Sequence, residues 1–276
     1  MDENDFAKVI ELITDKIGII PRDSHKTGIK NYIDKRINEL ENEMGSDFNY
    51  LEFLTSDSDE MMNLINSATV NETYFFREEA QFDLLKSKIF PELRMIKPLL
   101  PIRIWSAASS SGEEIYSLRL LASSMNIRTD CTASDINTKV LDICRKGEYR
   151  KNAIRAVDGS KYHCLLKAYM NEDGSFVIPE EIRSRINLKQ INLSHMTELP
   201  KNQDIVFIRN VFIYFSQEMK KQILQRITDE ALVPGGYLFL SMNEVASVDM
   251  SIIPKNLEKV SDGKVFYFHK KMQVVV

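Results

Sequence analysis

The sequence predicts an α/β protein in which a mostly helical N-terminal domain precedes a domain built on a parallel β-sheet. From about residue 5 to 100, apolar residues recur at helical spacing. From Ile102 onward, short apolar runs typical of buried strands alternate with longer amphipathic stretches. This alternation is expected of a sheet whose parallel strands are connected by crossover helices. We therefore expect a helical domain over residues 1–90 and a second domain over residues 91–276.

The N-terminal domain is expected to be helical because its apolar residues fall on single faces. The first helix is marked by apolar positions at helical spacing and by a glycine that stops it, namely Phe6, Val9, Ile10, Ile13, Ile17 and Gly18. Further helices are expected over residues 25–40, 48–54, 59–68 and 79–90. Prolines then punctuate the passage into the next domain, at Pro91, Pro98 and Pro101.

The second domain is expected to alternate strands with helices. The strands are predicted over residues 102–107, 128–135, 186–193, 204–209, 237–241 and 264–270. The helices are predicted over residues 113–125 and 138–146, and from the N-cap Ser216 to about residue 232, where Pro234-Gly-Gly236 ends the last one. Between residues 147 and 186 the alternation stops, and the turn signal Asn171-Glu-Asp-Gly-Ser175 predicts a β-hairpin.

Composition argues against several classes of protein. The chain has 276 residues, 43% of them hydrophobic, and a formal net charge of −4, so it lacks the basic excess of a nucleic-acid-binding domain. No apolar run reaches the roughly 18 residues that suggest a membrane span, and the acidic N-terminus is unlike a signal peptide. The three cysteines form no C-x-x-C pair, which indicates neither a disulfide framework nor a metal site. A cytoplasmic setting is expected.

Four segments carry the most specific patterns of the chain. They are Asn71-Glu-Thr-Tyr-Phe-Phe-Arg-Glu78, the strand and turn over residues 102–114, Ala133-Ser-Asp-Ile136 and the apolar run over residues 205–215. In this order they resemble the CheR family of chemotaxis receptor methyltransferases, over about residues 5–271. The resemblance implies a Rossmann-like, S-adenosylmethionine-dependent methyltransferase sheet with an antiparallel last strand. It also implies a small β-subdomain, inserted at about residues 148–190, that helps to dock the receptor.

The resemblance implies an activity as well as a fold. The family uses S-adenosylmethionine to esterify glutamate side chains of chemotaxis receptors for sensory adaptation, which leaves S-adenosylhomocysteine. The implied partners are the cytoplasmic methylation helices of membrane chemoreceptors, and we expect a monomer that does not insert into the membrane. Two other hypotheses stay open. One is a non-catalytic S-adenosylmethionine-binding regulatory module, and the other is a methyltransferase for a small molecule.

The cofactor is expected beyond the carboxyl ends of the parallel strands, near the switch in strand order. The turn from Ser106 to Gly112 offers small side chains and backbone N–H groups but lacks the spaced glycines of a dinucleotide loop. Asp135 ends the second strand, at the usual position of a carboxylate that accepts hydrogen bonds from the ribose hydroxyls of a cofactor. Alternatively, Asp135 or Asn137 could cap the helix that follows. By resemblance, the cofactor contacts are Asn71, Thr73, Arg77, Ala107, Glu114, Asp135, Asn192, Leu193, Asn210 and Val211.

Two side chains are expected to act on the substrate. A glutamate side chain ordinarily has a pKa of about 4.3 and is ionised at neutral pH, so its attack on a methyl group requires alignment rather than a general base. The planar guanidinium of Arg77 suits a carboxylate, unless it forms a surface ion pair with Glu78 or Glu79. Tyr214 either faces the sulfonium with its ring, orients the carboxylate with its hydroxyl, or is simply buried.

Other expectations concern single positions. Ile115 stands where the family commonly has proline, and Met242 stands where it often has histidine, so any role of that histidine is absent here. Phe75 and Phe76 are expected in the core. The helix over residues 25–40 carries a basic face that either complements acidic receptor helices or is merely solvated. That face consists of Lys26, Lys30, Lys35 and Arg36.

Overall fold

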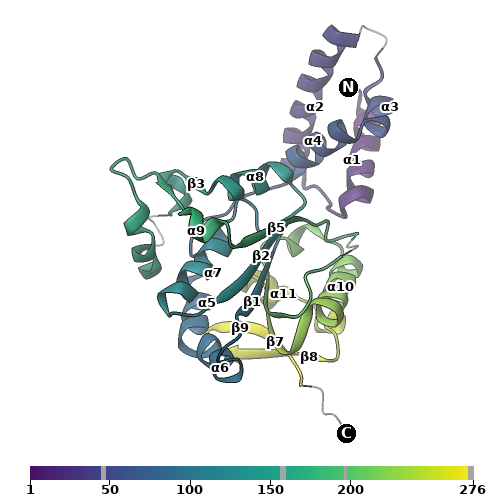
Figure 1. Ribbon diagram of the computed structural model, residues 1–276. Helices are drawn as coiled ribbons and strands as arrows, with labels where there is room; N and C mark the ends of the chain where they lie inside the picture. Colours follow the sequence, from purple (N-terminus) through teal and green to yellow (C-terminus); the bar gives the residue numbers. More distant parts are fainter. Residues whose placement is uncertain (45–47, 156–159, 196–197, 273–276) are drawn as a thin grey trace.

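The computed structural model describes residues 1–44, 48–155, 160–195 and 198–272, and Figure 1 shows a helical lobe beside one end of an α/β domain. The central sheet has seven strands in the order β5-β2-β1-β6-β7-β9-β8. They span Ile186–Gln190 (β5), Thr129–Asp135 (β2), Ile102–Ala107 (β1), Gln203–Ile208 (β6), Leu232–Phe239 (β7), Val265–Lys270 (β9) and Leu257–Asp262 (β8). The first five strands of this order, from β5 through β2, β1 and β6 to β7, pair in parallel. Strand β9 is antiparallel to both β7 and β8. The predicted methyltransferase-type sheet with an antiparallel last strand is confirmed.

Helices cover both faces of this sheet. They are α5 (Glu79–Leu84), η1 (Leu85–Ile89), α6 (Phe90–Ile96), α7 (Glu113–Ser124), α8 (Thr138–Lys146), α10 (Gln217–Arg226), η7 (Ile227–Ala231) and α11 (Met242–Ser247). Along β6, Ile205 and Phe207 join the core that includes α7, whereas Val206 and Ile208 join the core that includes α10. Successive strand residues point to opposite faces, so this apolar run is buried on both sides. The rigid sheet thereby fixes the turns at its strand ends.

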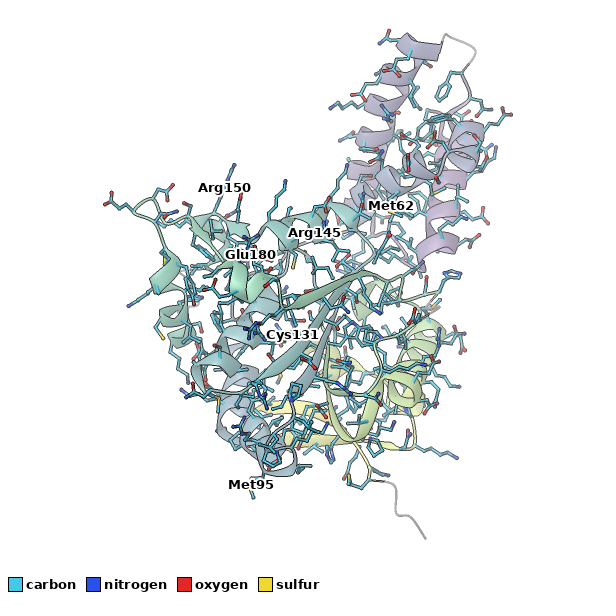
Figure 2. The ribbon with its side chains drawn as sticks, viewed as in Figure 1. Met62, Met95, Cys131, Arg145, Arg150 and Glu180 are labelled. Atoms are coloured by element: carbon cyan, nitrogen blue, oxygen red, sulfur yellow. The ribbon has the colours of Figure 1, made fainter. Side chains whose placement is uncertain are left out.

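The N-terminal lobe has a core of its own. Its helices are α1 (Glu3–Ile17), α2 (Asp23–Met44), α3 (Tyr50–Ser56) and α4 (Ser58–Ala68), and their buried apolar residues form one cluster that ends at Ala68. The helical run from Glu79 to Ile96, in contrast, packs Phe82 and Phe90 into the core of the sheet. Since a domain is defined by the core that it shares, we propose a boundary near residue 70 rather than at 90. In Figure 2, Met62 of α4 lies where the lobe meets the α/β domain, close to Gln190, whereas Met95 of α6 lies at the far end of that domain.

The inserted subdomain differs from the predicted hairpin. The turn is present, because the N–H of Asn171 donates to the carbonyl of Ser175 at 2.8 Å, but only Met170 and Phe176 bridge across it. Strand β4 (Phe176–Val177) pairs instead with β3 (Glu148–Tyr149), far away in sequence. The rest of the insert contains η2 (Lys151–Ala153), η4 (Lys161–Leu165), η5 (Lys167–Tyr169) and α9 (Glu180–Arg183).

Aromatic packing explains the pairing of β3 with β4. The Tyr149 and Phe176 rings stack with centroids 5.4 Å apart, and Phe75 packs edge-on against both of them. Phe75 and Phe76 are 0% and 2% exposed, so their predicted place in the core is confirmed. The long-range ring contacts outweigh the local turn signal, because large buried aromatic surfaces contribute more than one short ladder.

Three elements of the C-terminal part of the chain also differ from the prediction. Strand β7 begins at Leu232 and contains Pro234-Gly-Gly236, at an irregularity where the register against β6 shifts. Edge strand β8 was not predicted from the sequence, because its exposed positions weaken the apolar signal, and neither was α11. Among the described helices, none is long and apolar enough to cross a membrane.

Candidate cofactor pocket and active site

A pocket opens at the carboxyl ends of strands β5, β2, β1 and β6. Its empty volume is about 1050 Å³ including the open mouth, which suits a ligand of cofactor size. From β1 the chain proceeds to β2 on one side, whereas β6 lies on the other side, so the pocket sits at the switch in strand order. Open α/β sheets bind their ligands at this position.

Nearly all predicted site residues line this one pocket. They are Asn71, Thr73, Arg77, Glu114, Asp135, Asn192, Leu193, Asn210, Val211 and Tyr214. Ala107 is the exception: it is fully buried in β1, and the next residue, Ala108, lines the pocket in its place. Residues scattered over more than a hundred positions are thus brought together because four parallel strands end at one edge.

The turn after β1 is held in an uncommon backbone conformation. Ala108 and Ser110 have φ of 58° and 50°, in the left-handed region that few residues other than glycine adopt. Gly112 has φ of 97°, and a Cβ at this position would lie 2.3 Å from the Sγ of Cys144, so both conformation and space require glycine. Ser109 lines the pocket, and its buried Oγ has no hydrogen-bond partner among the described residues.

Asp135 fastens this turn to the end of β2. Its carboxylate accepts the main-chain N–H groups of Ser110 and Asn137, at 2.9 Å each. Burial raises the pKa of Asp135, and these backbone hydrogen bonds oppose that rise. The side chain of Asn137, rather than that of Asp135, caps α8 by accepting the N–H groups of Lys139 and Val140. A carboxylate has about four lone-pair positions, so Asp135 retains acceptor capacity on a pocket wall.

A buried cation that was not predicted from the sequence lies behind Glu114. The side chain of Arg209 is 3% exposed, and its Nε lies 3.3 Å from the carboxylate of Glu114, which also accepts the hydroxyl of Ser106 at 2.7 Å. Burial raises the pKa of Glu114, whereas Arg209 and Ser106 oppose that rise. Arg209 also donates to the main-chain carbonyl of Arg77 at 2.8 Å and to Gln81 at 3.1 Å. A charge inside the apolar run over residues 205–215, directly after β6, was the signal that could have identified it.

The N-terminal lobe supplies a wall of the pocket, which was not expected from the sequence. Ile17, Ile19 and His25 line it. The centre of the His25 ring lies 5.9 Å from the centre of the Tyr214 ring. Burial raises the pKa of Tyr214. The side-chain amide of Asn192 donates to the main-chain carbonyl of Lys16 at 2.7 Å. The pocket is therefore complete only with the two domains together.

Arg77 lies at the pocket with its guanidinium oriented by neighbours on its own loop. It donates to the main-chain carbonyl of Glu72 at 3.2 Å, and its Cζ lies 5.4 Å from the centre of the Tyr74 ring. Glu78 accepts the N–H of Met242, and Glu79 accepts that of Lys161. Within the described residues, Arg77 forms no ion pair with either glutamate.

Comparison with known proteins identifies the family. Residues 71–259 match the family described as CheR methyltransferase, SAM binding domain. The chain is 31% identical over 269 residues to chemotaxis protein methyltransferase 2 of Vibrio cholerae, which covers 95% of this chain and 92% of that protein. This chain belongs to the CheR methyltransferase family. It is thus an S-adenosylmethionine-dependent methyltransferase of a chemotaxis family.

A second relative is similar to this CheR chain to a comparable degree, whereas a solved structure is much more distant. Chemotaxis protein methyltransferase Cher2 of Pseudomonas putida is 36% identical over 192 residues, or 66% of this chain and 68% of that protein. Among solved structures, the S-adenosylmethionine-dependent methyltransferase SibL covers 80% of this chain and 61% of its own, with a TM-score of 0.40 and 10% identity. That likeness is too loose to add to the family assignment.

The polar groups of the pocket fit S-adenosylmethionine, the cofactor of the family. Asp135 offers a carboxylate with unused acceptor capacity, which suits ribose hydroxyls. Ser109 offers a buried hydroxyl with no described partner, and such a group is expected to meet a ligand or water. Glu114 offers an acidic group beside the buried Arg209.

Proposed function

We propose that this CheR methyltransferase esterifies glutamate side chains of chemotaxis receptors and so forms glutamyl methyl esters. The observation that carries the proposal is the position of Arg77. Its guanidinium lines the cofactor pocket together with Tyr214, and it is not consumed by an ion pair to Glu78 or Glu79 within the described residues. A planar fork with free donors is suited to orienting a carboxylate.

We assign the cofactor contacts as follows. Asp135 accepts the ribose hydroxyls, and Asn71 and Thr73 contact the methionyl end. The remaining members of the cofactor shell are Arg77, Glu114, Asn192, Leu193, Asn210 and Val211. When bound, S-adenosylmethionine supplies a methyl group that its sulfonium makes electrophilic. The protein side chains then have to bind, orient and exclude water.

The proposed chemistry matches what the pocket provides. A glutamate carboxylate is already ionised at neutral pH, since its ordinary pKa is about 4.3, and it needs no general base. Positioning alone can lower a barrier by roughly 7–11 kcal/mol. Arg77 orients the carboxylate while leaving one lone pair free. Tyr214 lines the same pocket and directs either its ring or its hydroxyl to the reacting groups.

The receptor is proposed from the names of the relatives rather than from a docking surface. Helix α2 does carry the predicted basic residues, but Arg36 donates to Glu60 at 2.8 Å and Lys26 donates to Asp23 at 3.0 Å. Lys35 lies 3.7 Å from Glu39. These pairs neutralise much of the face, which weakens the case for α2 as the attracting surface.

Methyl transfer to a receptor fragment tests this proposal. The protein is incubated with methyl-labelled S-adenosylmethionine and a fragment that contains the methylation helices of a chemoreceptor. We expect label that mild base releases as methanol, because esters hydrolyse there whereas N-methyl groups do not. Matched fragments with alanine in place of the glutamates serve as controls. Base-stable label, or none on any fragment, would refute glutamate esterification.

A further inference from the structure

Four side chains form a connected group at the mouth of the pocket. The ring of Tyr74 contacts the guanidinium groups of both Arg77 and Arg155, whose Cζ atoms are 5.4 and 4.7 Å from its centre. Glu72 contacts both arginines: its carboxylate accepts from Arg155, and its main-chain carbonyl accepts from Arg77 at 3.2 Å. We call Glu72, Tyr74, Arg77 and Arg155 the mouth cluster.

The mouth cluster joins two cavities. Glu72, Tyr74 and Arg77 line the cofactor pocket, whereas Glu72 and Arg155 line a neighbouring groove. Pocket and groove share one wall, made of the segment from Asn71 to Thr73. A protein side chain that enters from the groove therefore passes the ion pair of Glu72 and Arg155 before it reaches Arg77.

The inserted subdomain fixes Arg155 in this place. Two residues before it, the carbonyl of Ala153 accepts the N–H of Phe75 at 2.9 Å. The hydroxyl of Tyr149 donates to the carbonyl of Ser111 at 2.7 Å, and its ring lies edge-on to Phe75 with centroids 4.9 Å apart. The insert is thus bonded to the loop that carries Arg77 and to the turn after β1, and both of these segments line the pocket.

The position of Glu72 poses an electrostatic problem for an anionic substrate. Its carboxylate stands on the loop of Arg77, its side chain is largely exposed, and both residues line the pocket that a substrate carboxylate would enter. An unpaired glutamate there would repel the incoming carboxylate and would compete with it for Arg77. With Arg155 in place, the two arginines and one glutamate of the mouth cluster carry a net charge of +1; without it, the sum is zero.

We propose that Arg155 is a specificity-determining residue: by neutralising Glu72, it reserves Arg77 for an anionic side chain of the protein substrate. The inference rests on the proposed glutamate esterification and extends it, because it assigns selection for acidic substrates to the inserted subdomain. Arg155 acts through Glu72 and Arg77 and takes no part in the bond changes.

A double-mutant cycle on the full chain separates this role from simple fastening of the insert. The variants are Arg155→Ala, Glu72→Gln and their combination, and the measurements are kcat and KM for the receptor fragment and the affinity for S-adenosylhomocysteine. Arg155→Ala is expected to raise KM roughly two- to fivefold, the range that partly exposed ion pairs support. Both kcat and S-adenosylhomocysteine affinity stay near the wild-type values. Glu72→Gln does not raise KM, and the combined variant returns KM to the wild-type value.

If Arg155 only fastens the insert, breaking the ion pair from either side raises KM alike, and the combined variant recovers nothing. That result overturns the inference. Arg155→Lys keeps the positive charge, so its KM is expected to stay near the wild-type value, unlike that of Arg155→Ala. Arg150→Ala is a matched control, because Arg150 is an exposed arginine of the same groove. An equal rise in KM for Arg150→Ala overturns the inference too, since overall charge would then explain it.

Ionic strength and the wild-type reaction complete the test. The effect of Arg155→Ala on KM shrinks as salt rises, because these side chains are partly exposed. An effect that salt leaves unchanged contradicts the electrostatic role. A wild-type protein that forms no base-labile ester refutes the proposed function itself. If the wild-type protein is active but Arg155→Ala and Glu72→Gln change KM alike, only the role of Arg155 is refuted.

Discussion

The carboxylate of Glu244 accepts the main-chain N–H of Asn210 at 2.8 Å, and its second oxygen accepts that of Phe212 at the same distance. One side chain of α11 thus fixes the turn that follows β6. Asn210 has φ of 58°, a conformation that needs such support. Tyr214 follows within the same turn, so Glu244 determines where two predicted site residues lie.

Glu244→Gln is expected to loosen this turn. The substitution replaces an acceptor by an amide N–H₂ that faces main-chain donors, so at least one buried N–H loses its partner. We expect the free energy of unfolding to fall by about 1–3 kcal/mol and S-adenosylhomocysteine to bind more weakly. Chemical denaturation and calorimetric titration measure these effects. Glu258→Gln, on the exposed side of β8, is the control, and an equal loss there would contradict the explanation.

Asp135→Asn is expected to weaken S-adenosylhomocysteine binding. A hydrogen bond to a charged acceptor contributes about 1.5–3 kcal/mol, so the dissociation constant should rise at least tenfold. Calorimetric titration provides the measurement. Asp130→Asn is a matched control, because Asp130 lies on the same strand and is exposed. Unchanged affinity in a folded Asp135→Asn protein would remove Asp135 from the cofactor site.

The acid dependence of binding should follow the same carboxyl group. Burial raises the pKa of Asp135 above its ordinary value of 3.8, so Asp135 takes up its proton earlier in the folded protein on acidification. The protonated form favours folding, and this contribution to stability is lost as pH rises from 3.8 through the raised pKa. Ligand affinity changes in the opposite sense, since ribose hydroxyls need the carboxylate. Titrations over a pH series should show affinity falling on acidification in wild type and a flatter profile in Asp135→Asn.

Arg77→Lys tests whether the planar fork is required. Lysine keeps the charge but donates from a single point, so it cannot hold a carboxylate in a fixed plane. We expect kcat/KM for the receptor fragment to fall on the order of tenfold to a hundredfold, since small misalignments have costs of that size. Arg94→Lys, on an exposed position of α6, controls for loss of an arginine. A fully active Arg77→Lys enzyme would mean that charge alone suffices.

Tyr214 is expected to act through its ring. The guanidinium of Arg22 lies 5.9 Å from the ring centre, which indicates that the ring face attracts cations. Tyr214→Phe should therefore keep the wild-type single-turnover rate within about twofold, whereas Tyr214→Leu should lose stabilisation on the order of 0.5–2 kcal/mol. A slow Tyr214→Phe variant would instead assign the role to the hydroxyl.

There is a physical reason why some pocket-lining residues could be predicted from the sequence and others could not. Residues at or just after strand ends, such as Asp135 and Asn210, could be assigned to one pocket from the sequence. Parallel strands place their carboxyl ends at one edge of the sheet, however far apart the strands are in sequence. Arg209 and His25 were missed because their positions depend on tertiary packing. Arg209 reaches back to the loop of Arg77, and His25 comes to the pocket only when the N-terminal lobe docks.

The inserted subdomain shows where local signals fail. The turn over residues 171–175 formed as predicted, yet β4 found its partner in β3 because Tyr149 and Phe176 stack. Turn chemistry fixes a reversal of the chain, whereas pairing depends on which apolar faces meet. Arg155 depends on that arrangement, so its contact with Glu72 was not readable from the sequence.

Mapping the methylated residue tests the central claim most directly. The wild-type protein, S-adenosylmethionine and a receptor fragment are incubated, and the fragment is digested at mildly acidic pH and sequenced by tandem mass spectrometry. We predict the mass increase of one CH₂ group on glutamate side chains, absent without S-adenosylmethionine and strongly reduced with Arg77→Lys. The same increase on lysine, on a chain terminus or on no residue at all would contradict carboxylate methylation by this pocket.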